Sequence, residues 1–462
     1  MFENLILNNI PKRKINYNKS NNHRKVYIET YGCQMNLSDT EIILSVMSDF
    51  GFNETNIIEE SDVILLNTCS VRENAEKRIF NRLANLKKFK KNNPEILIGI
   101  LGCMAERLKN NLLEKEKLVD LIVGPDEYRK LPSLIENTFT TGEKGIAVKL
   151  SKIETYDDIV PVRKEGVSAW VTVMRGCDKF CSFCVVPFTR GRERSRKIDN
   201  IINEIKNLEQ SGVKDIWLLG QNVNSYKDGN FDFSDLVGSC AEAAKSARIR
   251  FTTSHPYDLS DKLLETISCH KNISKYIHLP IQSGSDRILK LMNRLYTVKQ
   301  YLRIIEYARK LMPNIGLSTD IITGYPSETE DDHKLTLNLM NEIQYDNAYM
   351  FAYSPRENTK SFSYPDDVKA EIKKRRLEEI IELQRKLSFK VNSSLIGKTV
   401  EVLIESVSKK SPDFLMGRTD CNKSTIVSKI YKEKGKELKI GEFINLNIYK
   451  ANSATLFGEA LN

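Results

Sequence analysis

The sequence contains no long hydrophobic run. No apolar stretch approaches the ~18 residues that a membrane helix needs, and the longest runs, such as Ile96–Cys103, are the length of a strand. Residues 1–23 are dominated by Asn, Lys and Arg and lack a small-residue cleavage site, so we expect a flexible polar arm and not a targeting peptide. These absences predict a cytoplasmic protein that does not enter a membrane.

A complete disulfide framework is also absent, because the chain has nine cysteines, an odd number. In a long, lysine-rich chain without a signal peptide, cysteines are more typical of metal ligands in a reducing compartment. The 462 residues are enough for about three domains, and the composition is that of an ordinary globular protein. The net charge of +9 permits a polyanionic partner without establishing one.

The most informative pattern is the C-x3-C-x2-C run of Cys177, Cys181 and Cys184. Three thiolates this close on one loop can bind three corners of a 4Fe–4S cluster, which leaves the fourth iron open to a small molecule. A structural zinc site is the main alternative. Zinc prefers four protein ligands, usually two separated C-x2-C pairs, and no fourth Cys or His lies near this run. The spacing therefore favours a cluster.

Strands and helices alternate in residues 24–140, which predicts an α/β domain with a doubly wound parallel sheet. The expected strands are Lys25–Thr30, Val63–Leu66, Ile96–Leu101 and Leu121–Val123, and the expected helices are Leu37–Phe50 and Arg72–Lys91. Cys33, Cys69 and Cys103 each follow a strand and precede a helix. Ligands bind at that edge of open α/β sheets, and helix N-termini favour thiolates there. The three cysteines are a candidate second cluster site, although one such cysteine alone could be a small buried residue.

After a linker over 141–165, six strand-like runs separated by helices predict an open (βα)6 partial barrel in 166–394. The expected strands are Ala169–Met174, Asp215–Leu219, Arg248–Thr253, Tyr276–Pro280, Gly316–Ile322 and Ala348–Tyr353, and a charged helix over Lys369–Lys390 closes the segment. The cluster loop follows the first strand, and polar or Gly-rich loops follow the others. Active sites of βα barrels lie at the C-terminal ends of the strands, so these loops are the expected wall of the site, although each alone is an ordinary turn.

Residues 395–462 are expected to form a small all-β barrel of the kind that binds RNA, with a structural or dimerising barrel as the alternative. The expected strands are Thr399–Ile404, Ser424–Val427, Phe443–Tyr449 and Thr455–Glu459. Gly417–Asp420 is expected to be a turn that presents Arg418.

Five basic residues and one acid fall within Arg190–Lys197, directly after the cluster loop. Arginine pairs with phosphate and stacks on bases, and a basic rim suits a nucleotide presented from a folded RNA. The same segment could instead be a solvated loop or be held in ion pairs within the protein. The candidate RNA contacts are Arg190, Arg192, Arg194, Arg196 and Arg418.

Three stretches make the chain resemble the methylthiotransferase family of radical S-adenosylmethionine (SAM) enzymes, and within it the MiaB-type branch that modifies tRNA. They are Tyr31–Asn36, Asn67–Arg72 and Arg175–Arg194, and the likeness extends over almost all of the chain beyond about residue 24. The resemblance implies an N-terminal methylthiotransferase domain, a radical SAM domain and a C-terminal TRAM domain. It also implies two 4Fe–4S clusters, an auxiliary one on Cys33, Cys69 and Cys103, and a SAM-binding one on Cys177, Cys181 and Cys184.

The resemblance further implies where SAM binds, because the loop after the second barrel strand holds the methionine part of SAM in this superfamily. The candidate cofactor contacts are Phe183, Gly220, Gln221, Asn222, Ser254, Gln282 and Asp320. TRAM domains bind RNA, which strengthens the RNA interpretation. Cys421 and the polar arm have no role in the resemblance, and Cys240 and Cys269 are expected to be thiols without a ligand role.

The implied reaction inserts a methylthio group at C2 of N6-isopentenyladenosine next to the anticodon (position 37) of tRNA. One SAM would supply the methyl group, and a second would be cleaved to the radical that removes hydrogen from C2. C2 carries no acidic proton and no leaving group, which is a physical reason for radical chemistry. We also expect a flavodoxin- or ferredoxin-type reductant, a sulfur donor and a monomeric protein.

Several alternatives remain open from the sequence. The acceptor could be N6-threonylcarbamoyladenosine in tRNA or an aspartate of a ribosomal protein, which modified-nucleoside analysis separates. The chain could be a radical SAM enzyme with a single cluster. It could also be a non-catalytic RNA-binding iron–sulfur protein, such as a redox sensor, which release of 5′-deoxyadenosine would exclude.

Overall fold

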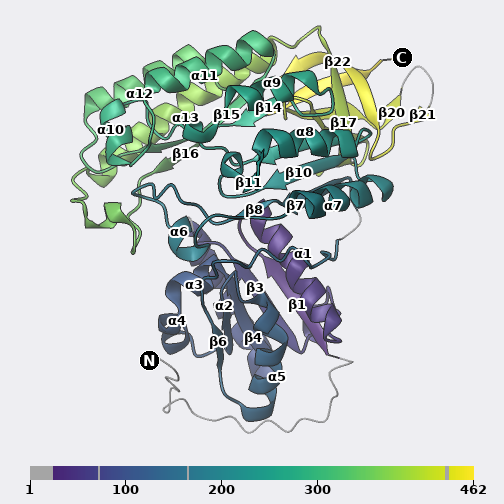
Figure 1. The fold of residues 1–462 in the computed structure, drawn as a ribbon, viewed down its shortest axis with the longest axis vertical. Helices are drawn as coiled ribbons and strands as arrows, with labels where there is room; N and C mark the ends of the chain where they lie inside the picture. The colour runs from purple at the N-terminus through teal and green to yellow at the C-terminus, as the bar shows by residue number, and fades with distance from the viewer. Residues whose placement is uncertain (1–23, 71–72, 164–165, 432–435, 462) are drawn as a thin grey trace. The chain divides into compact units, whose positions relative to one another are not determined.

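The computed structural model describes residues 24–70, 73–163, 166–431 and 436–461, and the predicted N-terminal arm lies outside the described residues. The chain forms two compact units, drawn in Figure 1. The first comprises residues up to 164 with 175–177 and 185–194, and the second comprises 165–174, 178–184 and 195–462. In the described part of the chain, no helix has the length and apolar character needed to cross a membrane.

The first unit is built on a six-stranded parallel sheet in the order β2-β1-β3-β4-β5-β6. Its strands are β1 (Lys25–Thr30), β2 (Asn53–Glu54), β3 (Val63–Thr68), β4 (Leu97–Gly102), β5 (Leu121–Val123) and β6 (Gly145–Ala147). Its main helices are α1 (Gln34–Asp49), α2 (Glu73–Asn92), α3 (Cys103–Leu108), α4 (Asn110–Lys115) and α5 (Leu131–Thr141), with the short α6 (Val186–Thr189).

Helices cover both faces of this sheet (Figure 1). Val63 and Leu65 of β3 pack in one hydrophobic cluster with residues of α1 and α5. The alternate residues Ile64 and Leu66 pack in a second cluster with residues of α2 and α3. Successive side chains of a strand point to opposite faces, so the uninterrupted apolar run of β3 is explained by burial on both sides. The predicted doubly wound sheet is confirmed.

The first unit extends beyond the boundary expected at residue 140. Strand β6 pairs with β5 and lies in the segment that the sequence suggested as a linker. Tyr156, further along the same segment, is buried in the hydrophobic cluster of α1 and α5. The segment 141–163 therefore contributes a strand and a buried tyrosine to the first unit and is not a free connection throughout.

The second unit begins with an open partial barrel of six parallel strands (Figure 1). Two three-stranded sheets, β13-β10-β7 and β14-β15-β16, are joined by a parallel bridge between Ile249 and Ile273. The strands are β7 (Ser168–Thr172), β10 (Asp215–Leu219), β13 (Arg248–Thr252), β14 (Tyr276–His278), β15 (Gly316–Thr323) and β16 (Asn347–Ala352). All six strands occur where the sequence predicted them.

Helices follow the strands and cover the outside of the partial barrel. They are α7 (Ile198–Gln210), α8 (Phe233–Ala243), α9 (Asp261–Cys269), α10 (Asp286–Leu291), α11 (Val298–Leu311), α12 (Glu330–Ile343) and α13 (Ala370–Ser393). Capping boxes start α11 at Thr297 and α12 at Thr329, where each threonine side chain accepts a hydrogen bond from a backbone N–H that the helix leaves unpaired.

The second unit ends in a closed five-stranded barrel, which confirms the predicted all-β segment. Its strands are β17 (Thr399–Val407), β18 (Phe414–Thr419), β19 (Ser424–Ser428), β22 (Phe443–Ala451) and β23 (Leu456–Ala460). The expectation of a turn at Gly417–Asp420 was wrong, because Gly417 and Arg418 lie inside β18. Gly417 serves close strand packing there, since a Cβ would lie 2.3 Å from the carbonyl oxygen of Leu403.

Buried arginines fasten this β-barrel to the partial barrel within the second unit. Arg250 of β13 donates to Asp215 (2.8 Å) and to the carbonyl oxygen of Thr419 (2.9 Å). Arg248 donates to Glu401 (2.9 Å) and to the carbonyl oxygen of Arg418 (3.1 Å). Both guanidinium groups are buried, and hydrogen bonds from a charged donor are strong, so the small barrel is held at a fixed place on the partial barrel.

Candidate functional site

The three cysteines of the first unit lie at one edge of its sheet. Cys33 is the N-cap of α1 after β1, Cys69 directly follows β3, and Cys103 begins α3 after β4. Strands β1, β3 and β4 are neighbours in the sheet and run parallel, so their carboxyl ends meet at that edge. The topology therefore has the arrangement that the sequence predicted for a shared ligand.

Glycines bring the cysteine-bearing loops close together. Gly32 has φ +135°, and a Cβ on it would lie 2.7 Å from the Cβ of Cys69. Gly102 has φ +86°, and a Cβ on it would lie 2.6 Å from the carbonyl oxygen of Thr68. Both positions combine a backbone conformation and a close approach that only glycine accommodates. The loops of Cys33 and Cys103 each approach the loop of Cys69, which fits a group held by all three thiols.

Two buried asparagines fix the same loops. Asn36 Nδ2 donates to Asn67 Oδ1 (3.2 Å) and to the carbonyl oxygen of Thr68 (3.1 Å). Asn67 Nδ2 donates in return to the carbonyl oxygen of Asn36 (2.8 Å). Cys33 Sγ lies 3.5 Å from Asn36 Oδ1. These contacts hold the backbone on both sides of Cys33 and Cys69 in one geometry.

A buried charge network lies beside Cys103. Arg190 Nε donates to Cys103 Sγ (3.1 Å), and Arg190 Nη1 lies 2.7 Å from Asp39 Oδ2. Arg175 Nη2 donates to the other carboxylate oxygen of Asp39 (2.6 Å). Burial raises the pKa of the Cys103 thiol, and the positive charge of Arg190 partly offsets that effect. A cation at hydrogen-bond distance is the environment that a ligating thiolate needs.

The other arginines that were predicted to contact RNA differ in burial and in their ion pairs. Arg194 is buried and donates to Asp126 (2.8 Å), and Arg196 is buried and pairs with Glu204 (2.8 Å). Arg192 is exposed, and Arg418 lies 3.2 Å from Glu405 and is partly exposed. Arg190, Arg194 and Arg196 are each buried and paired with a carboxylate of the protein, so they are not presented to a polyanion in this structure.

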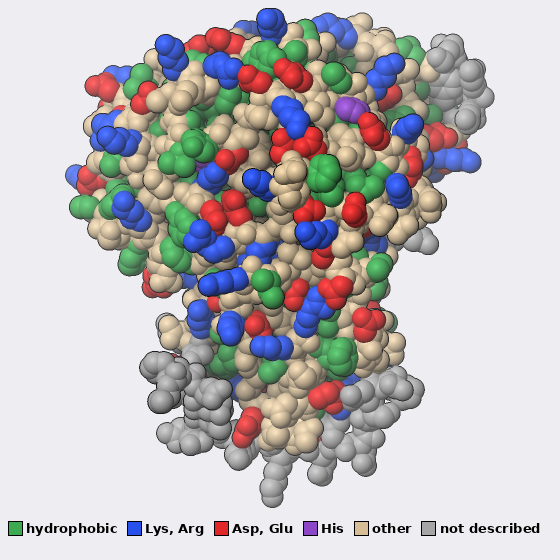
Figure 2. Space-filling model, in the orientation of Figure 1, with side chains coloured by type: hydrophobic (Ala, Val, Ile, Leu, Met, Phe, Trp, Pro, Cys, Tyr) green, Lys and Arg blue, Asp and Glu red, His purple; other side chains and the backbone are tan. Residues whose placement is uncertain are grey.

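The charges on one face of the second unit are mixed in sign. On the face seen in Figure 2, Lys and Arg side chains over the second unit are interspersed with Asp and Glu. The net charge of +9 therefore does not gather into one basic patch over that part of the face.

The cysteines of the C-x3-C-x2-C run are all half-buried. Cys177, in the first unit, donates its backbone N–H to the carbonyl oxygen of Gly191 (3.1 Å). Cys184 donates its backbone N–H to the carbonyl oxygen of Cys181 (3.0 Å), a tight turn within the second unit. Among the residues that the structure describes, no three His, Cys, Asp or Glu side chains converge on a site for one metal ion. A cluster does not require such convergence, because each thiolate binds a different iron.

The predicted SAM contacts lie at the carboxyl ends of the partial-barrel strands. Asn222 follows β10, Ser254 follows β13, and Gln282 follows β14. Each is buried and has one oxygen without a hydrogen-bond partner among the described residues, namely Asn222 Oδ1, Ser254 Oγ and Gln282 Oε1. Buried polar atoms rarely stay unpaired, so this set fits a polar ligand bound at the strand ends.

The other predicted cofactor contacts are Gly220, Gln221, Asp320 and Phe183. Gly220 directly follows β10, where a Cβ on it would lie 2.6 Å from Met174 Cγ, and Gln221 beside it is half-buried. Asp320 is a half-buried residue of β15. Phe183, in the cluster loop, packs against a hydrophobic cluster that includes Met292. Asp258 connects the loop after β10 with the cluster loop, because it accepts from Asn222 Nδ2 (2.7 Å) and from Lys179 Nζ (2.7 Å).

Sequence reasoning missed His255, which directly follows Ser254. Its Nδ1 accepts from the backbone N–H of Tyr257 (3.2 Å), so the proton of the neutral ring is on Nε2. That nitrogen is buried and has no partner in the part of the chain that the structure describes. Burial lowers the pKa of His255 to about 2, and the charges of Arg294 and Lys179 add to that effect. The ring is a neutral hydrogen-bond donor at the same strand ends. Its position in a predicted barrel loop was the only signal in the sequence.

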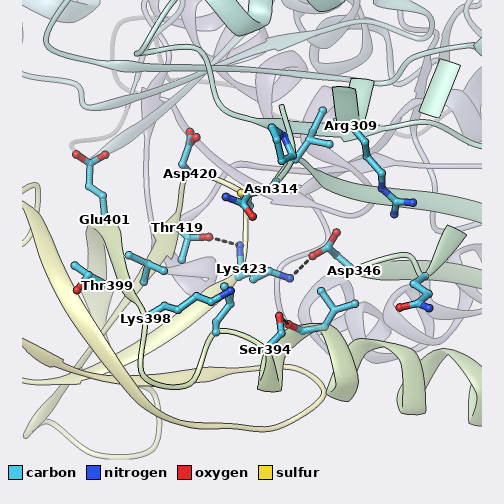
Figure 3. A pocket seen from close by; sticks show the side chains of 17 residues that line it. Arg309, Asn314, Asp346, Ser394, Lys398, Thr399, Glu401, Thr419, Asp420 and Lys423 are labelled. Carbon is cyan, nitrogen blue, oxygen red and sulfur yellow. Dashed lines mark hydrogen bonds and ion pairs between the residues drawn. The ribbon is translucent and has the colours of Figure 1, made fainter. Parts of the chain in front are cut away.

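A cavity of about 430 Å³ lies elsewhere in the second unit, between the partial barrel and the closed barrel (Figure 3). Its walls include Arg309, Asp346 and Lys398, and Lys423 donates to Asp346 and to Asn392 Oδ1 (3.0 Å). None of the predicted cofactor or cluster residues lines it, so we do not assign it to the cofactors.

Known family models match three successive stretches of the chain. The Uncharacterized protein family UPF0004 matches residues 25–124, the Radical SAM superfamily matches residues 171–340, and the TRAM domain matches residues 393–461. A solved structure of the radical SAM methyltransferase TsrM from Kitasatospora setae, with cobalamin and a 4Fe-4S cluster bound, has a TM-score of 0.54 at 11% identity. It covers 73% of this chain and 77% of that chain, and it supports the fold alone.

Curated relatives match nearly the whole length. A tRNA-2-methylthio-N(6)-dimethylallyladenosine synthase from Chloroherpeton thalassium is 50% identical over 444 residues, 96% of this chain and 97% of the relative. A protein of the same name from Christiangramia forsetii is 49% identical over 464 residues, 96% of this chain and 95% of the relative. The chain therefore belongs to the tRNA-2-methylthio-N(6)-dimethylallyladenosine synthase family of radical SAM enzymes.

Proposed function

We propose that this chain inserts a methylthio group at C2 of N6-isopentenyladenosine next to the anticodon, at position 37, of tRNA. The observation that carries the proposal is the position of Cys33, Cys69 and Cys103 at one sheet edge, in a chain that also has the C-x3-C-x2-C loop. A radical SAM enzyme that only abstracts hydrogen has no need of this second thiol set. The family membership supports the same substrate, because the curated relatives are named for this reaction.

Two 4Fe–4S clusters and SAM would supply the one-electron, sulfur-transfer and methyl-transfer chemistry, for which no side chain is suited. Cys33, Cys69 and Cys103 would hold the auxiliary cluster, and Cys177, Cys181 and Cys184 the SAM-binding one. The closely packed glycines and the paired asparagines around the first set keep its loops in place. Each set has three thiols, so each cluster would keep one iron without a protein ligand.

The polar atoms at the partial-barrel strand ends would bind and orient SAM. Asn222, Ser254 and Gln282 offer oxygens without protein partners, and His255 offers a neutral N–H donor. Holding SAM in one orientation at the open iron brings the reacting groups together, which is the main contribution a protein makes to such chemistry.

The closed barrel would bind the tRNA, as its match to TRAM domains suggests. Arg192 and Arg418 are the proposed arginine contacts, because the other candidates are buried in ion pairs. Phosphate contacts position an RNA, and the target base would then be presented from the single-stranded anticodon loop. The reaction also needs a flavodoxin- or ferredoxin-type reductant and a sulfur donor. We propose that the chain acts as a monomer in the cytoplasm, where tRNA is modified.

The test is nucleoside mass spectrometry of tRNA from a host that lacks its own methylthiotransferases. The tRNA is incubated anaerobically with reconstituted protein, SAM, sulfide and a reductant. Conversion of isopentenyladenosine to its 2-methylthio form supports the proposal. Release of 5′-deoxyadenosine without that product would reject this acceptor, and the same digest would reveal the 2-methylthio form of threonylcarbamoyladenosine. A parallel reaction with ribosomes covers the aspartate acceptor.

A further inference from the structure

A short segment after α10 holds the SAM-cluster loop within the second unit. Ser182 donates its backbone N–H to the carbonyl oxygen of Met292 (2.9 Å) and its hydroxyl to that of Leu291 (2.8 Å). Asn293 Nδ2 donates to the carbonyl oxygens of Phe180 (3.0 Å) and Lys179 (3.3 Å). The loop backbone on both sides of Cys181 is thus hydrogen-bonded to one segment.

Arg294, the next residue of that segment, reaches a cluster sulfur. Its Nη1 donates to Cys181 Sγ (3.3 Å), its Nε to the hydroxyl of Tyr296 (2.8 Å), and its Nη2 to the carbonyl oxygen of Pro280 (2.8 Å). The side chain is buried, with 8% of its surface exposed. Tyr296 is itself held by the carbonyl oxygens of Pro280 (3.1 Å) and Ile281 (3.0 Å), so the guanidinium has little freedom to turn away.

The charge of Arg294 has no carboxylate partner among the described residues, since all of its hydrogen-bond acceptors are a thiol, a hydroxyl and a carbonyl. A buried cation is costly unless an anion compensates it. Arg190 offers the contrast, because it donates to Cys103 in the first unit but also pairs with the carboxylate of Asp39. The anion that remains for Arg294 is the ligated thiolate itself, with the negative charge of the cluster to which it belongs.

We propose that Arg294 is a positioning residue of the SAM-binding cluster, which orients the Cys181 sulfur and favours the one-electron reduced state of the cluster. The proposal rests on the cluster assigned above to Cys177, Cys181 and Cys184. Reduction adds one electron from an external donor and makes the cluster more negative. A hydrogen bond to a ligand sulfur and an uncompensated positive charge both stabilise that state, and hydrogen bonds to sulfur and net charge are known determinants of cluster potential. The effect is strong in a buried site, where charges are poorly screened.

The test is a redox titration that is followed by electron paramagnetic resonance, with dithionite as the electron donor. The full chain carries Cys33→Ala, Cys69→Ala and Cys103→Ala as a background, so that only the SAM-binding cluster is observed. Arg294→Met removes both the charge and the donors, Arg294→Gln keeps donors without charge, and Arg294→Lys keeps the charge. Arg303→Gln is the control, because Arg303 is in the same unit with its side chain 65% exposed and pairs with Asp261.

We expect Arg294→Met and Arg294→Gln to make reduction at least tenfold less favourable, a shift of about 59 mV to lower potential for one electron. Arg294→Lys should shift less, and Arg303→Gln should not shift. An unchanged potential in Arg294→Met, with its roughly four irons retained, would overturn the proposal. If Arg294→Met loses iron, the potential of Arg294→Gln is measured instead, and an unchanged potential in that variant overturns the proposal. A parent chain without any cluster would instead reject the proposed function, and iron analysis of the parent detects that result before any variant is compared.

Discussion

Arg175 Nη2 lies 2.6 Å from Asp39 Oδ1, and neither side chain has exposed surface. Asp39 belongs to α1, whose N-cap is Cys33, and its other carboxylate oxygen faces Arg190, the arginine that donates to Cys103. A single buried carboxylate thus connects the helix that starts at one candidate ligand with the cation beside another. Both contacts lie within the first unit, and we expect them to stabilise its cysteine-bearing edge.

Replacing Asp39 by Asn should be strongly destabilising. The change leaves Arg175 and Arg190 buried without their shared anion, and breaking a buried ion pair from one side costs about 3–5 kcal/mol. We expect a loss of that size in the free energy of unfolding of the iron-free protein in urea. Asp158→Asn is the matched control, because Asp158 pairs with Arg129 but its side chain is 70% exposed. Equal effects of the two changes would contradict the importance assigned to the buried pair.

Replacing Gly32 by Ala should remove iron from the auxiliary site. The added Cβ would lie 2.7 Å from Cys69 Cβ and 2.7 Å from Asn36 Oδ1, at a φ of +135°. The loop must move, so we expect iron per chain after reconstitution to fall by roughly the four atoms of one cluster. Gly212→Ala tests positive φ without a collision, because Gly212 has φ +88° and open space around its Cβ position. Full iron retention in Gly32→Ala would show that the close approach is not needed.

Replacing His255 by Phe should weaken SAM binding without removing the cluster. Loss of one buried donor to a ligand is worth about 1–3 kcal/mol, or roughly a 5- to 150-fold increase in the SAM Kd. His270→Phe, at a half-buried histidine at the end of α9, should leave the Kd unchanged. The pKa of His255 is lowered to about 2, so the ring stays neutral above that pH and should add no pH dependence to SAM binding between pH 6 and 8. An unchanged Kd in His255→Phe would remove this residue from the SAM site.

The carboxylate of Asp332 should make the stability of the second unit depend on acidic pH. Burial alone would raise its pKa, but hydrogen bonds from Arg287, Ser285 and Thr329 outweigh burial and lower the pKa below its ordinary value of 3.8. A lowered pKa in the folded state means that the contribution is complete above about pH 4 and is lost as the pH falls through the lowered value. Asp332→Asn should therefore cost about 1–3 kcal/mol at pH 7, measured by urea unfolding of iron-free protein, with the difference shrinking below pH 4.

The adjacent Asp331 provides the control for that experiment, because its side chain is 91% exposed and it forms only a loose pair with Lys334 (3.5 Å). Asp331→Asn should change stability by less than about 0.5 kcal/mol at either pH, as exposed pairs do. A difference between Asp332→Asn and the parent that persists undiminished at low pH would contradict the assigned sign.

Local patterns explain why the fold was largely predictable. The apolar run of β3 and the strand–helix alternation around Cys33, Cys69 and Cys103 are properties of neighbouring residues, and the structure has all of them. In the six-stranded sheet and the closed barrel, the strands that were missed are β2 and β6, which are only two and three residues long, and β18, where Gly417 suggested a turn. In β18 the glycine is required by the approach of Leu403 from another strand, which no local pattern reveals.

The side-chain environment of the sites was less predictable, because it depends on residues far apart in the sequence. Asp39 and Arg175 are 136 positions apart, so the basic segment could not be distinguished from an RNA-binding rim by its composition. Arg294 and Cys181 are 113 positions apart. His255 stands out only in the structure, where its buried Nε2 has no hydrogen-bond partner among the described residues. Cysteine spacing predicts the cluster ligands, whereas the groups proposed to orient them are visible only in the folded chain.

The most direct test of the central claim compares the parent chain with the variant Cys33→Ala, Cys69→Ala, Cys103→Ala in one reaction with isopentenylated tRNA, SAM, sulfide and reductant. Both 5′-deoxyadenosine and the 2-methylthio nucleoside are measured by mass spectrometry. We expect the parent to yield both products, and the variant to release 5′-deoxyadenosine but to form no 2-methylthio nucleoside. A variant that forms the 2-methylthio nucleoside as well as the parent does would contradict it.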